Sequence, residues 1–252
     1  MNKSVGEMVL YSSMCIIGRI LAFSILFTAL FFVMGETKAF AASLTSQGLD
    51  AASHSVCLRM PDPNGRGKWP YNSRLIDDLL FVGGNPFHPQ SPPNSSSVVG
   101  KMMEHLYSCG IRSVICLHVP TDDKMVKEEE RLAEAAGLKT IRVPMNSERV
   151  PSASETELIF SLIRGKAYVH CQWGADRTGA VVAKYLRAFF GYSGREAWKA
   201  IIEKGSHAGR LGGFKVSPKL GLLLQYFWPE VIYEDSEVCK KYGLKYSGVE
   251  KK

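Results

Sequence analysis

The sequence predicts an α/β protein with a largely parallel sheet that is covered by helices on both faces. The main observation is that short apolar runs alternate along the chain with longer segments of helical spacing. The run 112–117, RSVICL, is apolar and β-branched, which is typical of a buried strand. Ser-x-x-Glu caps and Gly stops then mark where helices begin and end. This alternation favours parallel strands joined by helical crossovers.

The elements follow in order along the chain. The run 79–84, LLFVGG, is predicted to be an edge strand, and 85–97 must be loop because it carries four prolines. Ser152 with Glu155, and Ser193 with Glu196, form capping boxes that start two of the helices. The four predicted strands are 79–84, 112–117, 139–145 and 166–170. The predicted helices are 97–110, 122–137, 152–163, 178–190, 195–205 and 217–228. We find no internal repeat.

The composition is that of a globular protein with a mild basic excess. The chain has 252 residues, a formal net charge of +7 and a pI of about 9.1, and 22% of its residues are charged. Wholesale disorder is excluded. A basic excess favours anionic partners without choosing among them, and it is equally typical of a solvated surface. No basic run or aromatic-studded basic array indicates nucleic-acid binding.

Residues 1–41 have the pattern of a targeting segment. Ile20–Met34 carries no charge, basic residues precede it, and small residues at 39 and 41 suit a cut before Ala42. Removal as a signal peptide predicts a periplasmic or secreted protein. Retention as an inner-membrane anchor through residues 15–34 is the alternative, and only then do we expect membrane contact. The predicted organisation continues with a linker over 42–70, one domain over 71–235 and a tail over 236–252.

The cysteines are odd in number once the targeting segment is removed. At least one thiol is therefore unpaired or pairs outside the chain, and an oxidising compartment would allow two disulfides among the others. There is no Cys-x-x-Cys pair and His is scattered, so we expect neither a metal site nor a cofactor. The five cysteines are Cys57, Cys109, Cys116, Cys171 and Cys239.

The stretch 168–183, YVHCQWGADRTGAVVA, places Cys171 and Arg177 on a tight turn between a strand and a helix. Such a turn can point successive backbone N–H groups inward, and the helix N-terminus adds partial positive charge. Arg177 offers a planar fork that matches two phosphate oxygens. A thiolate at Cys171 would be stabilised by the same donors and placed for attack on phosphorus. Thr178 would hydrogen-bond the sulfur, and His170 would hold the loop.

The alternative interpretation is structural. A Cys and an Arg six positions apart occur by chance, buried cysteines are usually inert, and a His at a strand end is commonly a core residue. The order of strand, His-Cys, two glycines, Arg-Thr-Gly and helix favours the catalytic interpretation. The predicted phosphate-binding residues are Gln172, Trp173, Gly174, Ala175, Asp176 and Arg177.

The decapeptide HCQWGADRTG resembles the signature loop of the cysteine-dependent protein tyrosine phosphatase superfamily, in particular its bacterial dual-specificity-like branch. The resemblance extends from LLFVGGNP through GIRSVICLH, AAGLKTIRVPM and PSASETE to GYSGREAWKAII, about residues 75–205. It implies a protein tyrosine phosphatase-like fold with four or five strands flanked by helices. The implied activity is phosphomonoester hydrolysis.

The family's usual proton donor is absent. Its members generally carry an Asp on a loop about thirty residues before the cysteine, where this sequence has NSERVPS. The leading candidate is Asp176, which resembles the loop Asp of myotubularin-like phosphatases; the alternative for Asp176 is a carboxylate that braces the loop. Glu148 is the second candidate, though a solvated loop residue is its ordinary state. Asp122 or Asp123 is the third possibility.

The sequence leaves the substrate open. A phosphotyrosine protein, an inositol phosphate and a lipid headgroup all satisfy a phosphate-binding turn, and we expect tyrosine or dual-specificity activity first. Trp173 could stack on a substrate or pack under the loop. A catalytically silent phosphate-binding module is the rival from another class, supported by the missing Asp. A thiol redox protein is the weaker rival, because no resolving cysteine lies close in the sequence.

Overall fold

The centre of the fold is a mixed sheet with strand order β1-β2-β3-β6-β4-β5. The computed structural model describes residues 58–59, 64–119, 123–202 and 214–248, and all of them lie in the unit Ser53–Lys252. The strands are β1 (Leu58–Arg59), β2 (Arg74–Leu75), β3 (Leu80–Gly83), β4 (Ser113–Cys116), β5 (Lys139–Arg142) and β6 (Ala167–His170).

Four strands of this sheet are parallel, which confirms the predicted fold class. β6 pairs with β3 on one side and with β4 on the other, and β4 pairs with β5. The two-residue strands β1 and β2 add antiparallel pairs beyond β3. The prediction that 79–84 forms an edge strand is therefore wrong, because β2 covers that edge. β1 falls within the residues predicted as a linker.

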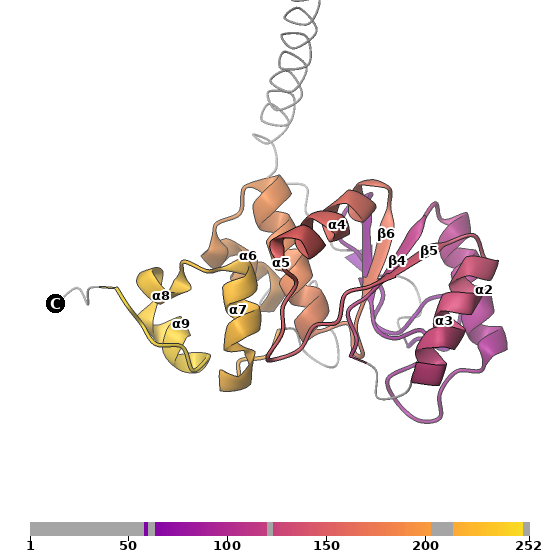
Figure 1. Ribbon diagram of the computed structural model, residues 1–252, viewed down its shortest axis with the longest axis horizontal. Coiled ribbons are helices and arrows are strands. Elements are labelled where there is room, and N and C mark those ends of the chain that lie inside the picture. The colour runs from indigo at the N-terminus through magenta and orange to yellow at the C-terminus, as the bar shows by residue number, and fades with distance from the viewer. Residues whose placement is uncertain (1–57, 60–63, 120–122, 203–213, 249–252) are drawn as a thin grey trace, which may run out of the picture. The chain divides into compact units, whose positions relative to one another are not determined.

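Helices cover both faces of the sheet (Figure 1). On one face, α2 and α3 pack on a core that includes Phe81, Val114 and Tyr168. On the other, α4 and α5 pack on Val82, Ile115 and Val169, and this core continues into the C-terminal helices. The helices are α2 (Ser96–Ser108), α3 (Asp123–Ala135), α4 (Ala153–Arg164), α5 (Asp176–Phe190), α6 (Gly194–Ile202), α7 (Gly221–Phe227), α8 (Val231–Glu234) and α9 (Ser236–Lys241), with a 3-10 turn at Pro218–Leu220.

Both predicted capping boxes are present. Ser152 Oγ accepts from the Glu155 N–H while the Glu155 carboxylate accepts from the Ser152 N–H. Ser193 and Glu196 exchange the same pair of bonds at the start of α6. Each box satisfies two N–H groups that a helix start leaves without a partner, which is worth about 1 kcal/mol for the capping residue.

The C-terminal residues belong to the core on the α5 side. The sequence predicts a tail over 236–252, whereas α9 begins at Ser236 and the side chains of Cys239 and Tyr242 are fully buried. Tyr242 accepts a hydrogen bond from the indole of Trp198 at 3.0 Å. The short helix escapes prediction because six residues are too few to display a helical period.

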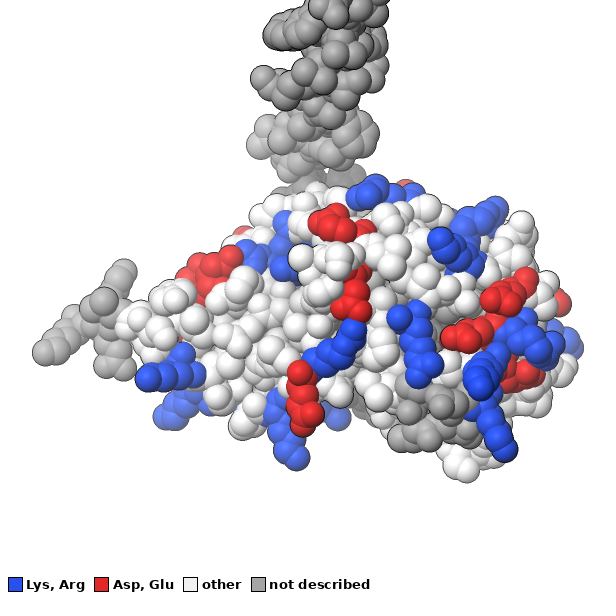
Figure 2. Space-filling view, viewed as in Figure 1, with Lys and Arg blue, Asp and Glu red and all other residues white. Residues whose placement is uncertain are grey.

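The surface and the thiols add little to the choice of function. On the face in Figure 2, basic and acidic side chains are interspersed. Cys109, Cys116, Cys171 and Cys239 are free thiols in the part of the chain that the structure describes. Among those same residues, no helix is both long and apolar enough to span a membrane. Cys57 and the predicted targeting segment lie outside the described residues.

Candidate active site

The predicted turn lies at the carboxyl end of the central strand. β6 ends at His170, the loop runs from Cys171 to Ala175, and α5 begins at Asp176. β6 is flanked by parallel strands on both sides, so the loop sits where ligands bind in sheets of this kind. The helix begins two residues earlier than predicted and brings Arg177 into its first turn.

The carbonyl groups of the loop are held by neighbouring residues. The carbonyl oxygen of Gln172 accepts from the Asn85 N–H at 3.1 Å. Those of Trp173 and Gly174 accept from Asn72 Nδ2 at 3.1 and 3.4 Å. Carbonyl groups tied to the surrounding residues are typical of a phosphate-binding nest, in which the backbone N–H groups face the anion.

Arg74 is the buried anchor of this arrangement. Its side chain has no exposed surface, and it donates to the carbonyl of Gly174 at 2.9 Å and to that of Asn72 at 2.5 Å. A buried guanidinium must find acceptors, so these contacts tie the loop to β2. Arg74 and Asn72 could not be identified from the sequence, since a polar residue about 100 positions away along the chain carries no local signal.

Gly174 must be glycine. Its φ is +65°, and a Cβ there would lie 2.3 Å from the carbonyl carbon of Gly83 and 2.6 Å from the nitrogen of Gly84. Both are backbone atoms that cannot rotate away. The two glycines that end the LLFVGG run thus make room for the loop, and Tyr168 holds Gly84 by donating to its carbonyl at 2.6 Å.

Cys171 is a buried thiol with a lowered pKa. Its exposed fraction is 2%. Burial opposes ionisation, but the charge of Arg177, the Thr178 hydroxyl, and the backbone N–H groups of Thr178 and Ala175 outweigh it. The Thr178 hydroxyl has no other hydrogen-bond partner among the described residues. The environment of the thiol is thus the one expected for a nucleophile that ionises at the base of an anion site.

Arg177 is held by a histidine that the sequence analysis did not single out. Its NH1 lies 3.2 Å from Nδ1 of His118. His118 lies two residues after the end of β4 and is half-buried. Burial, followed by the charge of Arg177, lowers the pKa of His118 to about 4. At neutral pH the imidazole is therefore uncharged, and Nδ1 accepts the hydrogen bond from Arg177.

His170 forms a buried ion pair behind the nucleophile. Its Nε2 lies 2.7 Å from Oε1 of Glu129 on α3, and both side chains are nearly inaccessible. Burial disfavours the charged imidazole, yet the negative charge of Glu129 leads the opposing causes and the pKa of His170 is raised well above its ordinary value. The pair holds the last residue of β6 against α3, which supports the predicted loop-holding role.

Cys116 lies beside this pair. The ligand atoms of Cys116, Glu129 and His170 all fall within 4.8 Å of one another. The direct contact of 2.7 Å between imidazole and carboxylate is a hydrogen-bond distance, shorter than two ligands keep around a shared ion. We therefore assign the three side chains to a hydrogen-bonded cluster and not to a set of metal ligands.

Asp176 contacts the segment after the undescribed residues 203–213. Its Oδ1 accepts from the backbone N–H of Lys215 at 2.8 Å. This contact corresponds to the alternative predicted for Asp176, a carboxylate that braces the loop and is not the acid. Its Oδ2 makes no hydrogen bond within the described part of the chain. Of the other candidates, Asp122 lies outside the described residues and Asp123 begins α3.

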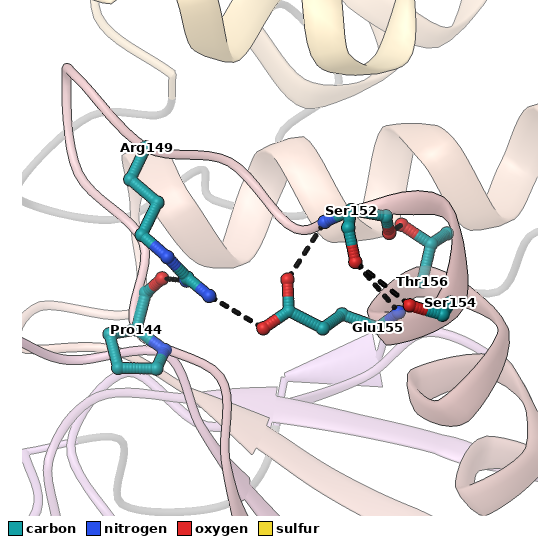
Figure 3. A network of polar contacts seen from close by, with 6 residues as sticks. All are labelled: Pro144, Arg149, Ser152, Ser154, Glu155 and Thr156. Carbon is teal, nitrogen blue, oxygen red and sulfur yellow. Dashed lines mark hydrogen bonds and ion pairs between the residues drawn. The ribbon is translucent and has the colours of Figure 1, made fainter.

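The loop at the position where the resemblance implies an acid is braced at both ends. Oδ1 of Asn146 accepts from the N–H groups of Glu148 and Arg149, each at 2.8 Å. Arg149 donates to the carbonyl of Pro144 and to Glu155 at the start of α4 (Figure 3). Glu148 itself is exposed. Asn146 thus stabilises a turn at the place where the sequence lacks the expected Asp.

Trp173 is a partly exposed aromatic residue on the loop. Its exposed fraction is 37%, and its ring meets that of Tyr71 edge-on with centroids 6.1 Å apart. Two roles are predicted for Trp173, stacking on a substrate or packing under the loop. Its exposure excludes the interpretation that the ring packs entirely under the loop. Gln172 is half-buried and Ala175 is buried.

Comparison with known proteins identifies one matching family model. Residues 90–189 match the model of a family described as Tc-R-P, polymorphic toxin system, DSP-PTPase phosphatase. No curated protein matches the chain.

Three solved structures to which the chain is similar are the following. Pseudomonas aeruginosa TpbA is 15% identical, with a TM-score of 0.46 over 76% of this chain and 96% of its own. Tk-PTP in its active form is 17% identical, with a TM-score of 0.45 over 62% of this chain and 95% of its own. The core catalytic domain of the PP-IP phosphatase SIW14 from Saccharomyces cerevisiae is 16% identical, with a TM-score of 0.43 over 68% and 90%.

Proposed function

We propose that the chain is an exported, metal-independent phosphomonoester hydrolase with a phosphocysteine intermediate. The match of residues 90–189 to a DSP-PTPase phosphatase family supports this proposal. The observation that carries the proposal is the environment of the Cys171 thiol. It lies buried under a loop whose carbonyls are tied outward, and its pKa is lowered chiefly by Arg177 against the effect of burial.

In the first step the Cys171 thiolate attacks phosphorus, the S–P bond forms and the ester P–O bond breaks. Arg177 and the N–H groups of residues 172–177 bind the equatorial oxygens and stabilise the charge that spreads over them. These donors supply the stabilisation that a metal ion would otherwise provide. The leaving oxygen takes a proton from an acid.

In the second step water attacks the phosphocysteine, the S–P bond breaks and inorganic phosphate leaves. The thiolate returns to the state that Arg177 and Thr178 stabilise, so the sulfur is a good leaving group. The deprotonated acid from the first step accepts the proton of the attacking water. We keep Asp176 as the first candidate for this acid and Glu148 as the second.

For substrate we propose phosphotyrosine or broad dual-specificity activity. The half-exposed ring of Trp173, with Tyr71 beside it, offers an aromatic surface on the loop against which an aryl phosphate could pack. Inositol phosphates and phosphoinositide headgroups are the alternative substrates. Export rests on the pattern of residues 1–41, and either removal of that segment or its retention as an anchor would place the domain outside the cytoplasm.

One observation favours the silent phosphate-binding module as a second candidate. Asn146 caps its own loop where the family usually has an Asp, so the chain shows no carboxylate at that position. A pure binder, however, has no need of a thiol whose pKa is lowered.

Hydrolysis by the purified full chain separates the candidates. The panel is an aryl phosphate, a phosphotyrosine peptide, inositol hexakisphosphate and a phosphatidylinositol phosphate, all with chelator. We expect turnover that survives chelator and is lost in Cys171→Ser, and the preferred substrate names the class. Binding of phosphate esters without any turnover would favour the silent module. Asp176→Asn should lose the limb of the pH–rate profile that reports the acid; an unchanged profile would remove Asp176 from that role.

A further inference from the structure

His118 stands at the edge of the phosphate site without a role in the mechanism above. It follows β4, whose last residue pairs with His170, so it is level with the start of the catalytic loop. Its Nδ1 contacts Arg177, the residue proposed to bind phosphate. Its Nε2 makes no hydrogen bond with any described residue. The imidazole is thus half-buried, contacts Arg177 through Nδ1 and has no hydrogen bond at Nε2 among the described residues. An imidazole in this position would be affected by an anion bound at Arg177.

The charges around His118 come from four different elements. Arg177 on α5, His170 on β6 and Arg142 on β5 disfavour a second positive charge, while Glu129 on α3 favours it. Burial is the largest cause that keeps the ring neutral, and Arg177 is the next. These causes together leave an uncharged imidazole beside a charged guanidinium.

A bound phosphate dianion would reverse this balance. It lies against Arg177 and brings two negative charges into the space where that single positive charge acts on His118. Protonation of Nδ1 would also end its contact with Arg177, which frees NH1 of the guanidinium to donate to a phosphate oxygen. Both changes favour the bound state.

We propose that His118 is a phosphate-contacting residue that takes up one proton from solvent when a dianionic phosphate group binds, and so becomes a second cation beside Arg177. The inference rests on the proposed phosphate site and adds a residue to it. By linkage, a site that gains a proton on binding holds the dianion more tightly as the pH falls.

The test measures proton uptake directly. The full chain with Cys171→Ser removes the thiolate, which could otherwise take the proton itself. Inorganic sulfate is the probe because it stays a dianion at mildly acidic and neutral pH. Calorimetric titration at about pH 5.5 in two buffers with different ionisation enthalpies gives the number of protons taken up. We expect it to approach one per sulfate, with affinity weakening by up to about tenfold per pH unit.

His118→Asn assigns the proton, because the Asn amide oxygen can still accept from Arg177 but cannot be protonated. We expect uptake to disappear and the affinity to become independent of pH. The matched control is His105→Asn on α2, a histidine whose pKa is also lowered but which lies away from the site; its uptake should equal that of the parent.

Two results would overturn the inference alone: sulfate binding without proton uptake, or uptake that persists in His118→Asn. Absence of any sulfate binding would overturn the phosphate site itself, and with it the proposed function. If His118→Asn does not fold, the imidazole resonance of His118 in the Cys171→Ser chain gives the same answer by NMR. Its titration midpoint must rise when sulfate is added, and an unmoved midpoint contradicts the proposal.

Discussion

Replacing Gly174 with Ala should both destabilise the protein and disable the loop. At a φ of +65°, an Ala residue costs about 1–2 kcal/mol of backbone strain. Its Cβ would also meet three backbone atoms of Gly83 and Gly84 at 2.3–2.6 Å, and overpacking of this kind typically costs a further 1–3 kcal/mol. The expected loss in the free energy of unfolding is thus about 2–5 kcal/mol.

Gly191 provides a matched control. It has a φ of +69° at the end of α5, but a Cβ there would meet nothing within 4 Å. Gly191→Ala should therefore show the strain alone, about 1–2 kcal/mol, with unchanged activity. Urea unfolding of both variants, with hydrolysis of an aryl phosphate, gives the comparison.

Activity is the second measure. Relief of the clash must push the loop away from β3, and a displacement near 1 Å costs about a hundredfold in rate. Equal destabilisation by the two substitutions, or a Gly174→Ala variant with full activity, would refute the claim that the loop is packed directly on these glycines.

Three further changes test the surroundings of the loop. Arg74→Met leaves the carbonyl of Gly174 without its buried donor, and urea unfolding should show a loss of about 1–3 kcal/mol together with reduced kcat. Glu129→Gln should destabilise the protein most below about pH 6.5, the ordinary pKa of a histidine. The raised pKa of His170 contributes stability that is fully present below this pH and is lost as the pH rises through the pKa of the folded state. Thermal unfolding at several pH values measures this dependence. Removing the charge of Arg177 should raise the pKa of Cys171, seen as alkylation by iodoacetamide that begins at higher pH.

Each of these predictions has a result that contradicts it. Arg112→Met is the control for Arg74→Met, since Arg112 also donates to carbonyls but is exposed; equal effects would mean that burial is unimportant. A cost of Glu129→Gln that grows with pH would reverse the assigned charge of His170. An alkylation profile that does not move without Arg177 would leave the thiol stabilised by hydrogen bonds alone.

The sequence was informative where the signal is local. The Cys171–Arg177 turn, the four parallel strands and both capping boxes are short contiguous patterns, and each is present in the structure. The two antiparallel strands beside β3 could not be predicted, because a two-residue strand has no periodicity to read. Their effect is large all the same, since they carry Arg74 to the loop.

The residues that support the loop differ in how far they could have been found. Glu129 occupies a position on α3 between Val126 and Ala133, on the buried stripe of the helix, so its place in the helical pattern was a usable signal. His118 comes directly after the predicted strand 112–117, at the edge of the sheet where ligands bind. Asn72, by contrast, acts through a contact across about a hundred residues, which single-sequence reasoning cannot see.

The most direct test of the central claim is to trap the intermediate. The full chain is mixed, in the presence of chelator, with a phosphate ester labelled on phosphorus. The reaction is quenched with acid within one turnover, and the protein is digested for peptide mapping. The account predicts a labelled peptide that contains Cys171, with the label lost in Cys171→Ser. Turnover without a labelled peptide, or a label on any other residue, would contradict catalysis by a Cys171 nucleophile.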